Sequence, residues 1–328
     1  MFRMESLTQE FDWERMNNMN ELNIEFYPDD FEFVGDKQDI TIDQVVPCKP
    51  AWKDALSRFS KNKGAVVGCI CILVITLFAI FAPMISHWQY DDINTAIDNI
   101  KPCSQHIFGT DSFGRDLFVR TWKGTRISLF IACVAIVIDV VIGMIYGLIS
   151  GYFGGKVDSI MQRIQEIINS IPTLVVLTLL LMVMKSSLFT IIVALSFTEW
   201  IGMSRITRAQ VLKIKEEEFV LASRTLGAGS FFIIFKEILP NIYSQLIIMV
   251  MMSIPNAIFY EAYLSFVGLG LPIPAASLGT LINDGFDKIT VYPYQMVIPV
   301  VVFSILMLSF NLFGDGLRDA LDPTMKEM

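Results

Sequence analysis

The chain has 328 residues, of which 53% are hydrophobic and 18% charged, and its mean hydropathy is +0.54. This composition excludes an ordinary soluble domain and is typical of a protein with several membrane-spanning segments. The net charge of −8 is concentrated in residues 1–46, which carry −9 by themselves, so the charge does not indicate nucleic-acid binding or an acidic substrate site.

The first 50 residues form an acidic segment with weak hydrophobic periodicity. We expect residues 1–50 to be a cytoplasmic extension, either flexible and loosely docked or a regulatory tail that binds a partner. Residues 51–86 follow as a basic cytoplasmic lead-in and a first membrane helix, and they start the part of the chain suited to lipid.

Six apolar segments are long enough to cross about 30 Å of hydrocarbon, which takes about 20 helical residues. They are Gly64–Ile85, Ile127–Phe153, Ile167–Met184, Ser187–Met203, Asn241–Phe259 and Tyr294–Gly314. The predicted fold is therefore all-α and polytopic, with six transmembrane helices and a five-helix core over residues 127–316.

The distribution of lysine and arginine predicts the orientation of these helices, because basic residues concentrate in cytoplasmic loops. Basic clusters precede the first span and fill the loop between the fourth and fifth spans. We expect both termini, including a tail over residues 317–328, to be cytoplasmic. Four basic residues fall outside in this topology, and Asp111 and Asp116 offset part of their charge. They are Arg115, Arg120, Lys123 and Arg126.

Residues 87–126 form the expected extracellular segment. Within it Phe113, Leu117 and Phe118 would lie on one side of a short interfacial helix. The chain has two histidines, His87 and His106, so the sequence predicts no histidine-based metal site.

The loop between the fourth and fifth spans contains "KEEEFVLASRTLGAGSFFIIFKEILPN". The three consecutive glutamates at its start suit the first turn of a helix, whose macrodipole favours carboxylates. Small and apolar residues then share one face at helical spacing, and Gly227 is a natural left-handed stop. The pattern predicts a short helix over about 216–227. Its face would either cap the protein's own bundle or bind another protein.

This loop resembles the EAA loop of ATP-binding-cassette importer permeases, with Ala222, Ser223, Gly227 and the pair Leu239–Pro240 at motif positions. Leu221 stands where that motif has its glutamate. Four further stretches resemble the C-type permease of oligopeptide and dipeptide importers, so that the resemblance covers about residues 55–323. They are "RFSKNKGAVVG", "HIFGTDSFGRDLFVRTWKGTRISL", "EAYLSFVGLGLPIPAASLGTLINDG" and "FNLFGDGLRDALDP".

The resemblance implies a type I importer permease fold in a bacterial plasma membrane, in a subunit that is not an enzyme and holds no cofactor. A sister permease would complete the path for oligopeptides or dipeptides, and two cytoplasmic ATPases would hold the ATP and magnesium. An extracellular binding protein would deliver the substrate, and no nucleic acid is involved. The residues implied in coupling to an ATPase are Glu218, Phe219, Ala222, Ser223, Arg224, Leu226 and Gly227.

Two acidic residues lie within the apolar spans, where a carboxylate costs about 2.5–3.5 kcal/mol by insertion scales. Asp139 is expected to line the pore or to bond to a neighbouring helix. Glu199 is expected to line the pore or to lie at the membrane interface.

The alternatives are an importer of the same class for nickel or another small solute, and a self-sufficient secondary transporter. The second would show inverted repeats and discontinuous midplane helices, which this sequence does not. A membrane-embedded enzyme would need clustered histidines and acids near the membrane face.

Overall fold

The computed structural model describes residues 51–321, and this range is helical with no β-strand. The predicted extension over residues 1–50 and the last seven residues lie outside the described range. The α-helices are α2 (Ala51–Lys61), α3 (Lys63–Ile85), α4 (Leu117–Phe153), α5 (Gly155–Asn169), α6 (Thr173–Met184), α7 (Leu188–Thr198), α8 (Trp200–Ile214), α9 (Glu218–Thr225), α10 (Ser230–Phe232), α11 (Leu239–Leu264), α12 (Leu278–Phe286) and α13 (Tyr294–Leu321). Three short turns are the 3₁₀ helix η3 (Thr95–Ile97) and the π-helices η4 (Ile233–Ile238) and η5 (Ser265–Leu269).

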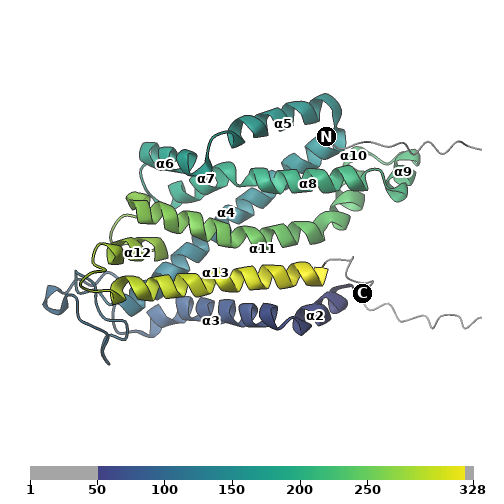
Figure 1. Ribbon diagram of the computed structural model, residues 1–328. Coiled ribbons are helices and arrows are strands. Elements are labelled where there is room, and N and C mark those ends of the chain that lie inside the picture. The colour runs from purple at the N-terminus through teal and green to yellow at the C-terminus, as the bar shows by residue number, and fades with distance from the viewer. Residues whose placement is uncertain (1–50, 322–328) are drawn as a thin grey trace, which may run out of the picture. The chain divides into compact units, whose positions relative to one another are not determined.

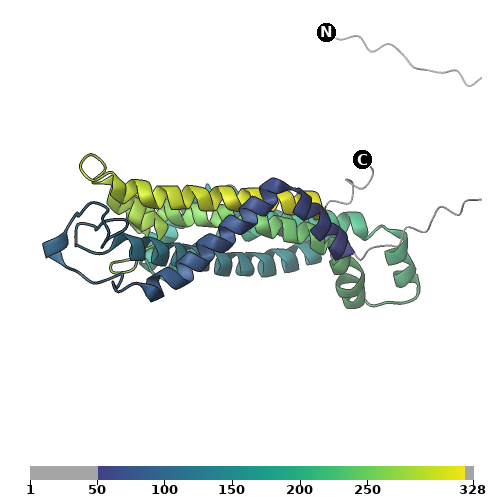
Figure 2. The same ribbon diagram turned by 90° about the horizontal axis from the view of Figure 1, so that it is seen from below.

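The long helices run along the molecule as a bundle in which α3 packs on α13, α13 on α11, and α4 on α8 (Figures 1 and 2). We call the right-hand end of Figure 1 the α9 end. It carries α2, α9 and the last turns of α13. We call the opposite end, with α12 and residues 86–116, the α12 end. Both ends of the described chain therefore lie at the α9 end.

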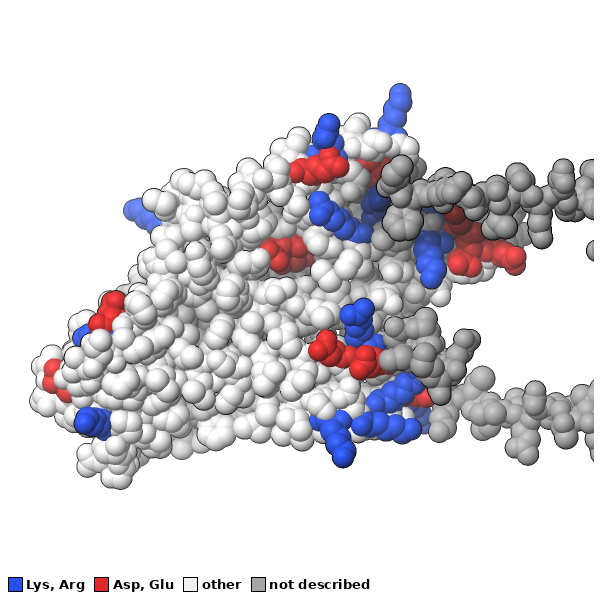
Figure 3. All heavy atoms as spheres, in the orientation of Figure 1, with Lys and Arg blue, Asp and Glu red and all other residues white. Residues whose placement is uncertain are grey.

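An apolar band separates the two ends of the molecule. Figure 3 shows acidic and basic side chains gathered mainly at the two ends of the face in view. Five helical elements of the described range are long and apolar enough to cross a membrane, and α5 together with α6 would make a sixth. The five are Lys63–Ile85, Leu117–Phe153, Leu188–Ile214, Ser230–Leu269 and Tyr294–Leu321. The predicted all-α, multi-pass membrane protein is confirmed.

The third predicted span, Ile167–Met184, is wrong as a single helix. Helices α5 and α6 are bent by 75° at the break between Asn169 and Thr173. Pro172 lies at the start of α6, and proline disfavours helical backbone in the residue before it. Most of the predicted segment is therefore the short helix α6, and the first residues of the predicted segment belong to α5.

The short helix expected through Phe113, Leu117 and Phe118 does not form as a separate element. Phe113 lies in a loop, and α4 begins at Leu117 and continues without a break to Phe153. The Asp116 carboxylate accepts a hydrogen bond from the Val119 amide at 2.9 Å and caps the helix. The predicted second span thus begins ten residues after the start of α4, because the basic residues before Ile127 were expected to lie outside the membrane.

Small residues hold α4 against α8. A Cβ atom added to Gly143 would lie 2.6 Å from the Trp200 carbonyl oxygen, and one added to Gly147 would lie 2.5 Å from that of Ser204. Glycines four residues apart lie on one helix face, so the two backbones approach closely, as in membrane helices with small residues at their interface. This seam ties the centre of α4 to the helix that leads into the loop with α9.

Candidate functional site

Helix α9 projects from the α9 end and is shorter than predicted, since it spans Glu218–Thr225 rather than about 216–227 (Figure 1). Its last turn closes with two backbone hydrogen bonds: the Gly227 amide to the Arg224 carbonyl at 3.0 Å, and the Ala228 amide to the Ser223 carbonyl at 3.1 Å. This is a Schellman motif, which needs a residue in the left-handed region. Gly227 has φ +87°, so the predicted glycine stop is confirmed.

One side chain anchors α9 to the bundle. Val220 is fully buried and packs in an apolar cluster with Leu148 of α4, Val211 of α8 and Ile238 of η4. The residues predicted to share the docking face remain accessible, apart from Ser223, which is half-buried. Leu226 is 88% exposed. Helix α9 is therefore held from one side and presents the other side to its surroundings.

Polar contacts connect α9 and its flanks to the membrane helices. The Arg224 guanidinium lies 5.8 Å from the centre of the Tyr152 ring near the end of α4. The Lys215 ammonium donates to the Gly151 carbonyl of the same helix at 3.1 Å. The Ser223 hydroxyl donates to Glu237 of η4 at 3.3 Å. A force on α9 would thus reach α4 by several routes.

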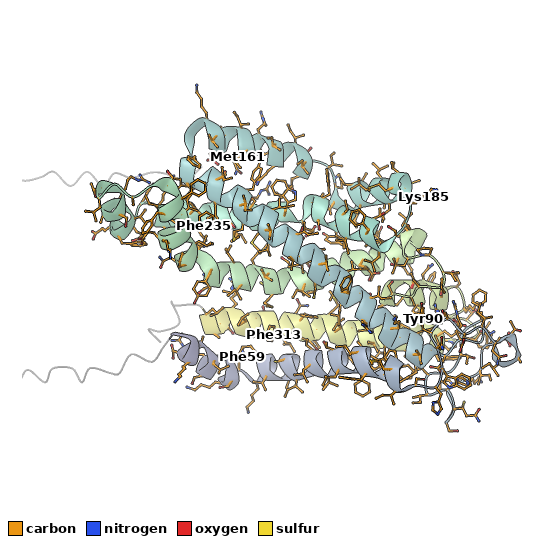
Figure 4. The ribbon with its side chains drawn as sticks, turned by 180° about the vertical axis from the view of Figure 1, so that it is seen from behind. Phe59, Tyr90, Met161, Lys185, Phe235 and Phe313 are labelled. Carbon is orange, nitrogen blue, oxygen red and sulfur yellow. The ribbon has the colours of Figure 1, made fainter. Side chains whose placement is uncertain are left out.

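An aromatic surface follows α9 in the chain. Phe231, Phe232 and Phe235 are exposed, and the Phe231 and Phe235 rings stack with centres 6.2 Å apart. Figure 4 labels Phe235. The intervening Ile233 and Ile234 are buried in the same cluster as Val220. The sequence analysis did not single out these aromatic residues, although their alternation with buried isoleucines was a usable signal.

The two acidic residues within the spans lie on neighbouring elements. Asp139 is 6% exposed in the middle of α4, and its Oδ1 atom has no hydrogen-bond partner in the described range. One turn before it, the Ala135 carbonyl accepts a weak bond from Ser196 of α7 at 3.4 Å. One turn after it, Gly143 touches the backbone of Trp200. Asp139 therefore faces the α7–α8 junction, which contains the partly buried Glu199.

A buried carboxyl that the sequence analysis missed lies near the α12 end. Glu261 of α11 is fully buried and accepts hydrogen bonds from Ser128 of α4 at 2.7 Å and from Ser265 of η5 at 2.8 Å. The Ser277 hydroxyl, which caps α12, bonds to Ser265 at 3.2 Å, and the Leu278 amide donates to Ser128 at 3.2 Å. Glu261 and the hydroxyl groups around it thus form a buried network that joins α4, α11 and α12.

At the α12 end, Asp111 contacts two of the basic residues that the predicted topology places outside. Its carboxylate accepts from the Arg115 Nε atom at 2.7 Å and lies 3.4 Å from that of Arg120. Both arginines are buried, and Asp284 of α12 lies nearby. Burial raises the pKa of the Asp284 carboxyl, although the two arginines act in the opposite direction. The sequence predicted the compensation by Asp111 but not the burial.

Comparison with known proteins identifies the class. Residues 140–327 match the family model described as binding-protein-dependent transport system inner membrane component, and residues 51–102 match the N-terminal transmembrane domain of oligopeptide transport permease C. The chain belongs to this family of inner membrane transport components. It is a membrane subunit of a transporter and not an enzyme, as predicted.

Two relatives and one solved structure define the similarity further. The oligopeptide transport system permease protein OppC of Bacillus subtilis is 49% identical over 84% of this chain and 90% of its own length. The dipeptide transport system permease protein DppC of the same organism is 43% identical over 91% and 94%. A chain of the inward-facing MetNI methionine ABC transporter shares the fold, with a TM-score of 0.50, 22% identity and coverage of 63% of this chain and 96% of that one.

Proposed function

We propose that the chain is the permease subunit of an ATP-driven importer of oligopeptides or dipeptides, and that α9 is the helix by which separate ATPase subunits move it. The peptide substrate is supported by the names of the relatives, which are 49% and 43% identical over most of both chains. The single observation that carries the coupling role is an exposed helix fixed to the bundle through one buried side chain, Val220.

The coupling surface consists of the seven residues implied by the EAA resemblance. A helix of eight residues is marginal alone and gains order from a partner. Leu226 and Phe219 provide exposed apolar groups that suit a pocket on an ATPase. Arg224 and Lys215 connect the movement of α9 to the end of α4, whose glycine seam carries it to α8.

The partners follow from the same proposal. A sister permease completes the substrate path, two ATPases bind ATP and magnesium at the α9 end, and an extracellular binding protein delivers the peptide at the α12 end. Asp139 and Glu199 line part of the path. Support for this role comes from the Oδ1 atom of Asp139, which is buried and has no hydrogen-bond partner in the described range.

The experiment compares Leu226→Asp with Val291→Asp. Both replace an exposed aliphatic side chain, Leu226 at the α9 end and Val291 in the turn before α13 at the α12 end, so neither substitution disturbs the core. The chain is co-expressed with the sister permease and the ATPases. Leu226→Asp is expected to lower both ATPase co-purification and ATP-driven uptake of a labelled peptide by about tenfold or more, because it places a charge in an apolar contact.

Val291→Asp is expected to behave as the unmodified chain in both measurements. Normal co-purification of Leu226→Asp would reject the coupling role of α9. Uptake of peptide by the chain without ATPases would reject the importer as a whole. Uptake of nickel but not of peptide by the assembled complex would reject the substrate class alone.

A further inference from the structure

Two adjoining cavities lie at the α12 end, between the last turns of α3 and the first turns of α4. One has a volume of about 430 Å³ and is lined mainly by apolar side chains, among them Phe78, Phe81 and Phe118. The other has a volume of about 370 Å³ and contains the cationic side chains of Lys123 and Arg126. Ser86 and Trp88 line both cavities, so the two lie side by side.

The cations of the second cavity have no anionic partner within the described residues. Arg115 and Arg120 both lie within ion-pair distance of Asp111, whereas no carboxylate lies within that distance of Lys123 or Arg126 in residues 51–321. The Lys123 ammonium instead lies 5.1 Å from the centre of the Tyr90 ring. Lys123 is half-buried and Arg126 is exposed, and two neighbouring cations without a counter-ion favour the binding of an anion.

The position of the two cavities matches the boundary of the membrane. Helix α3 is an apolar span that ends at Ile85, and Phe81 and Ile85 near its end are exposed. The apolar cavity therefore lies beside the last turns of a lipid-facing helix. The cationic cavity is lined by the polar residues that follow it in the chain. An amphiphile with an anionic head and an apolar tail matches this arrangement, since its tail suits the apolar cavity and its head suits the cationic one.

We propose that the two cavities together bind one anionic phospholipid. Its phosphate would lie between Lys123 and Arg126, and an acyl chain would occupy the apolar cavity beside Phe81. The lysine and arginine then have a structural reason to lie at the end of the molecule where the predicted topology does not expect positive charge. The inference depends on the membrane location of the chain and not on its substrate.

The test titrates the full-length chain, delipidated in detergent, with dioleoyl phosphatidylglycerol or dioleoyl phosphatidylcholine and measures bound lipid by native mass spectrometry. The unmodified chain is expected to retain phosphatidylglycerol with at least fivefold preference. The double substitution Lys123→Gln with Arg126→Gln is expected to lower phosphatidylglycerol affinity by about tenfold, because each basic residue near an anionic headgroup contributes several-fold to binding. Phosphatidylcholine binding should change little.

Lys185→Gln is the matched control, since Lys185 lies in the α6–α7 turn at the same end of the molecule and lines neither cavity (Figure 4). It is expected to keep the preference, as is Lys123→Arg. An unmodified chain without preference, or a double variant that keeps it, would overturn the proposal. Competition by glycerol 3-phosphate as effective as that by the lipid would exclude the acyl chain. Lipid bound to the isolated chain but absent from the assembled transporter would identify the cavities as a contact with another subunit.

Discussion

Two carboxyl groups within the apolar helices differ in how completely they are hydrogen-bonded. Both oxygens of Glu261 accept hydroxyl bonds, from Ser128 and Ser265, so its burial is compensated locally. Asp139 is almost as buried, yet one of its oxygens has no partner in residues 51–321. A buried polar group with all its hydrogen bonds stabilises a particular packing of the helices. A buried polar group without a partner raises the free energy of the folded protein, and a hydrogen bond from a substrate or partner can lower it. Glu261 is therefore interpreted as structural.

Replacing Glu261 with alanine is expected to destabilise the protein by about 2–4 kcal/mol, because the substitution leaves a cavity and two buried hydroxyl groups without their acceptor. Glu261→Gln keeps one acceptor oxygen and should cost less. The measurement is thermal unfolding in detergent, with Glu166→Ala in an exposed ion pair as the control. Equal unfolding temperatures for Glu261→Ala and the control would contradict a structural role for Glu261.

The element that matters most for the proposed function, α9, depends on local backbone geometry as well as on packing. Gly227 and Gly229 both follow its end at Thr225, and a Cβ atom added to either would meet no heavy atom within 4 Å. Only Gly227 has a positive φ, at +87°, while Gly229 has φ −70° in the extended region. Substitution of the two glycines therefore isolates the cost of a positive φ, because an added Cβ atom has room at both positions.

Gly227→Ala is expected to cost about 1–2 kcal/mol at the end of α9, since an L-residue in the left-handed region strains its Cβ atom. Gly229→Ala should be neutral or slightly stabilising, because alanine adopts its backbone angles without strain. Hydrogen exchange of the Gly227 and Ala228 positions, whose amides close the helix, measures the difference. Protection should fall roughly fivefold or more in the first variant only, as expected for a cost of that size. Equal loss in both would assign the effect to the loop as a whole.

At the scale of the whole molecule, the charge distribution and the bundle define two ends but not which faces the cytoplasm. Helix α2 packs back on the end of α13, with the rings of Phe59 and Phe313 5.5 Å apart, so both described ends of the chain belong to the α9 end (Figure 4). The lysine and arginine distribution predicts that this end is cytoplasmic. Cys103, in the segment at the α12 end, provides a natural reporter because its side chain is exposed.

In intact cells a membrane-impermeant maleimide is expected to label Cys103, and Cys103→Ser should lose that label. A cysteine introduced by Ser230→Cys, at the exposed start of α10, should react only after the membrane is permeabilised. The physical reason is that both sites are accessible to water but lie at opposite ends of the apolar band. The reverse pattern would invert the predicted topology.

The sequence by itself determined the class of fold, the number of apolar segments to within one bent pair, and the place of α9. These features are local: a run of about 20 apolar residues, a group of acids at a helix start and a glycine at its end are each readable along the chain. The family followed from ordered stretches of the same kind, and the comparisons confirmed it.

Only the tertiary structure decided which polar residues are buried and what surrounds them. The sequence places Arg120 in the external segment, whereas in the structure it is buried in α4, with Asp111, nine residues earlier, 3.4 Å from its guanidinium group. Ser128 bonds to Glu261 directly and Ser277 bonds to it through Ser265, although Ser128 and Ser277 are separated by almost half of the chain. The cavities beside Lys123 likewise exist only where α3 meets α4. Burial and pairing depend on distant segments brought together in space, and no periodicity along a single sequence records them.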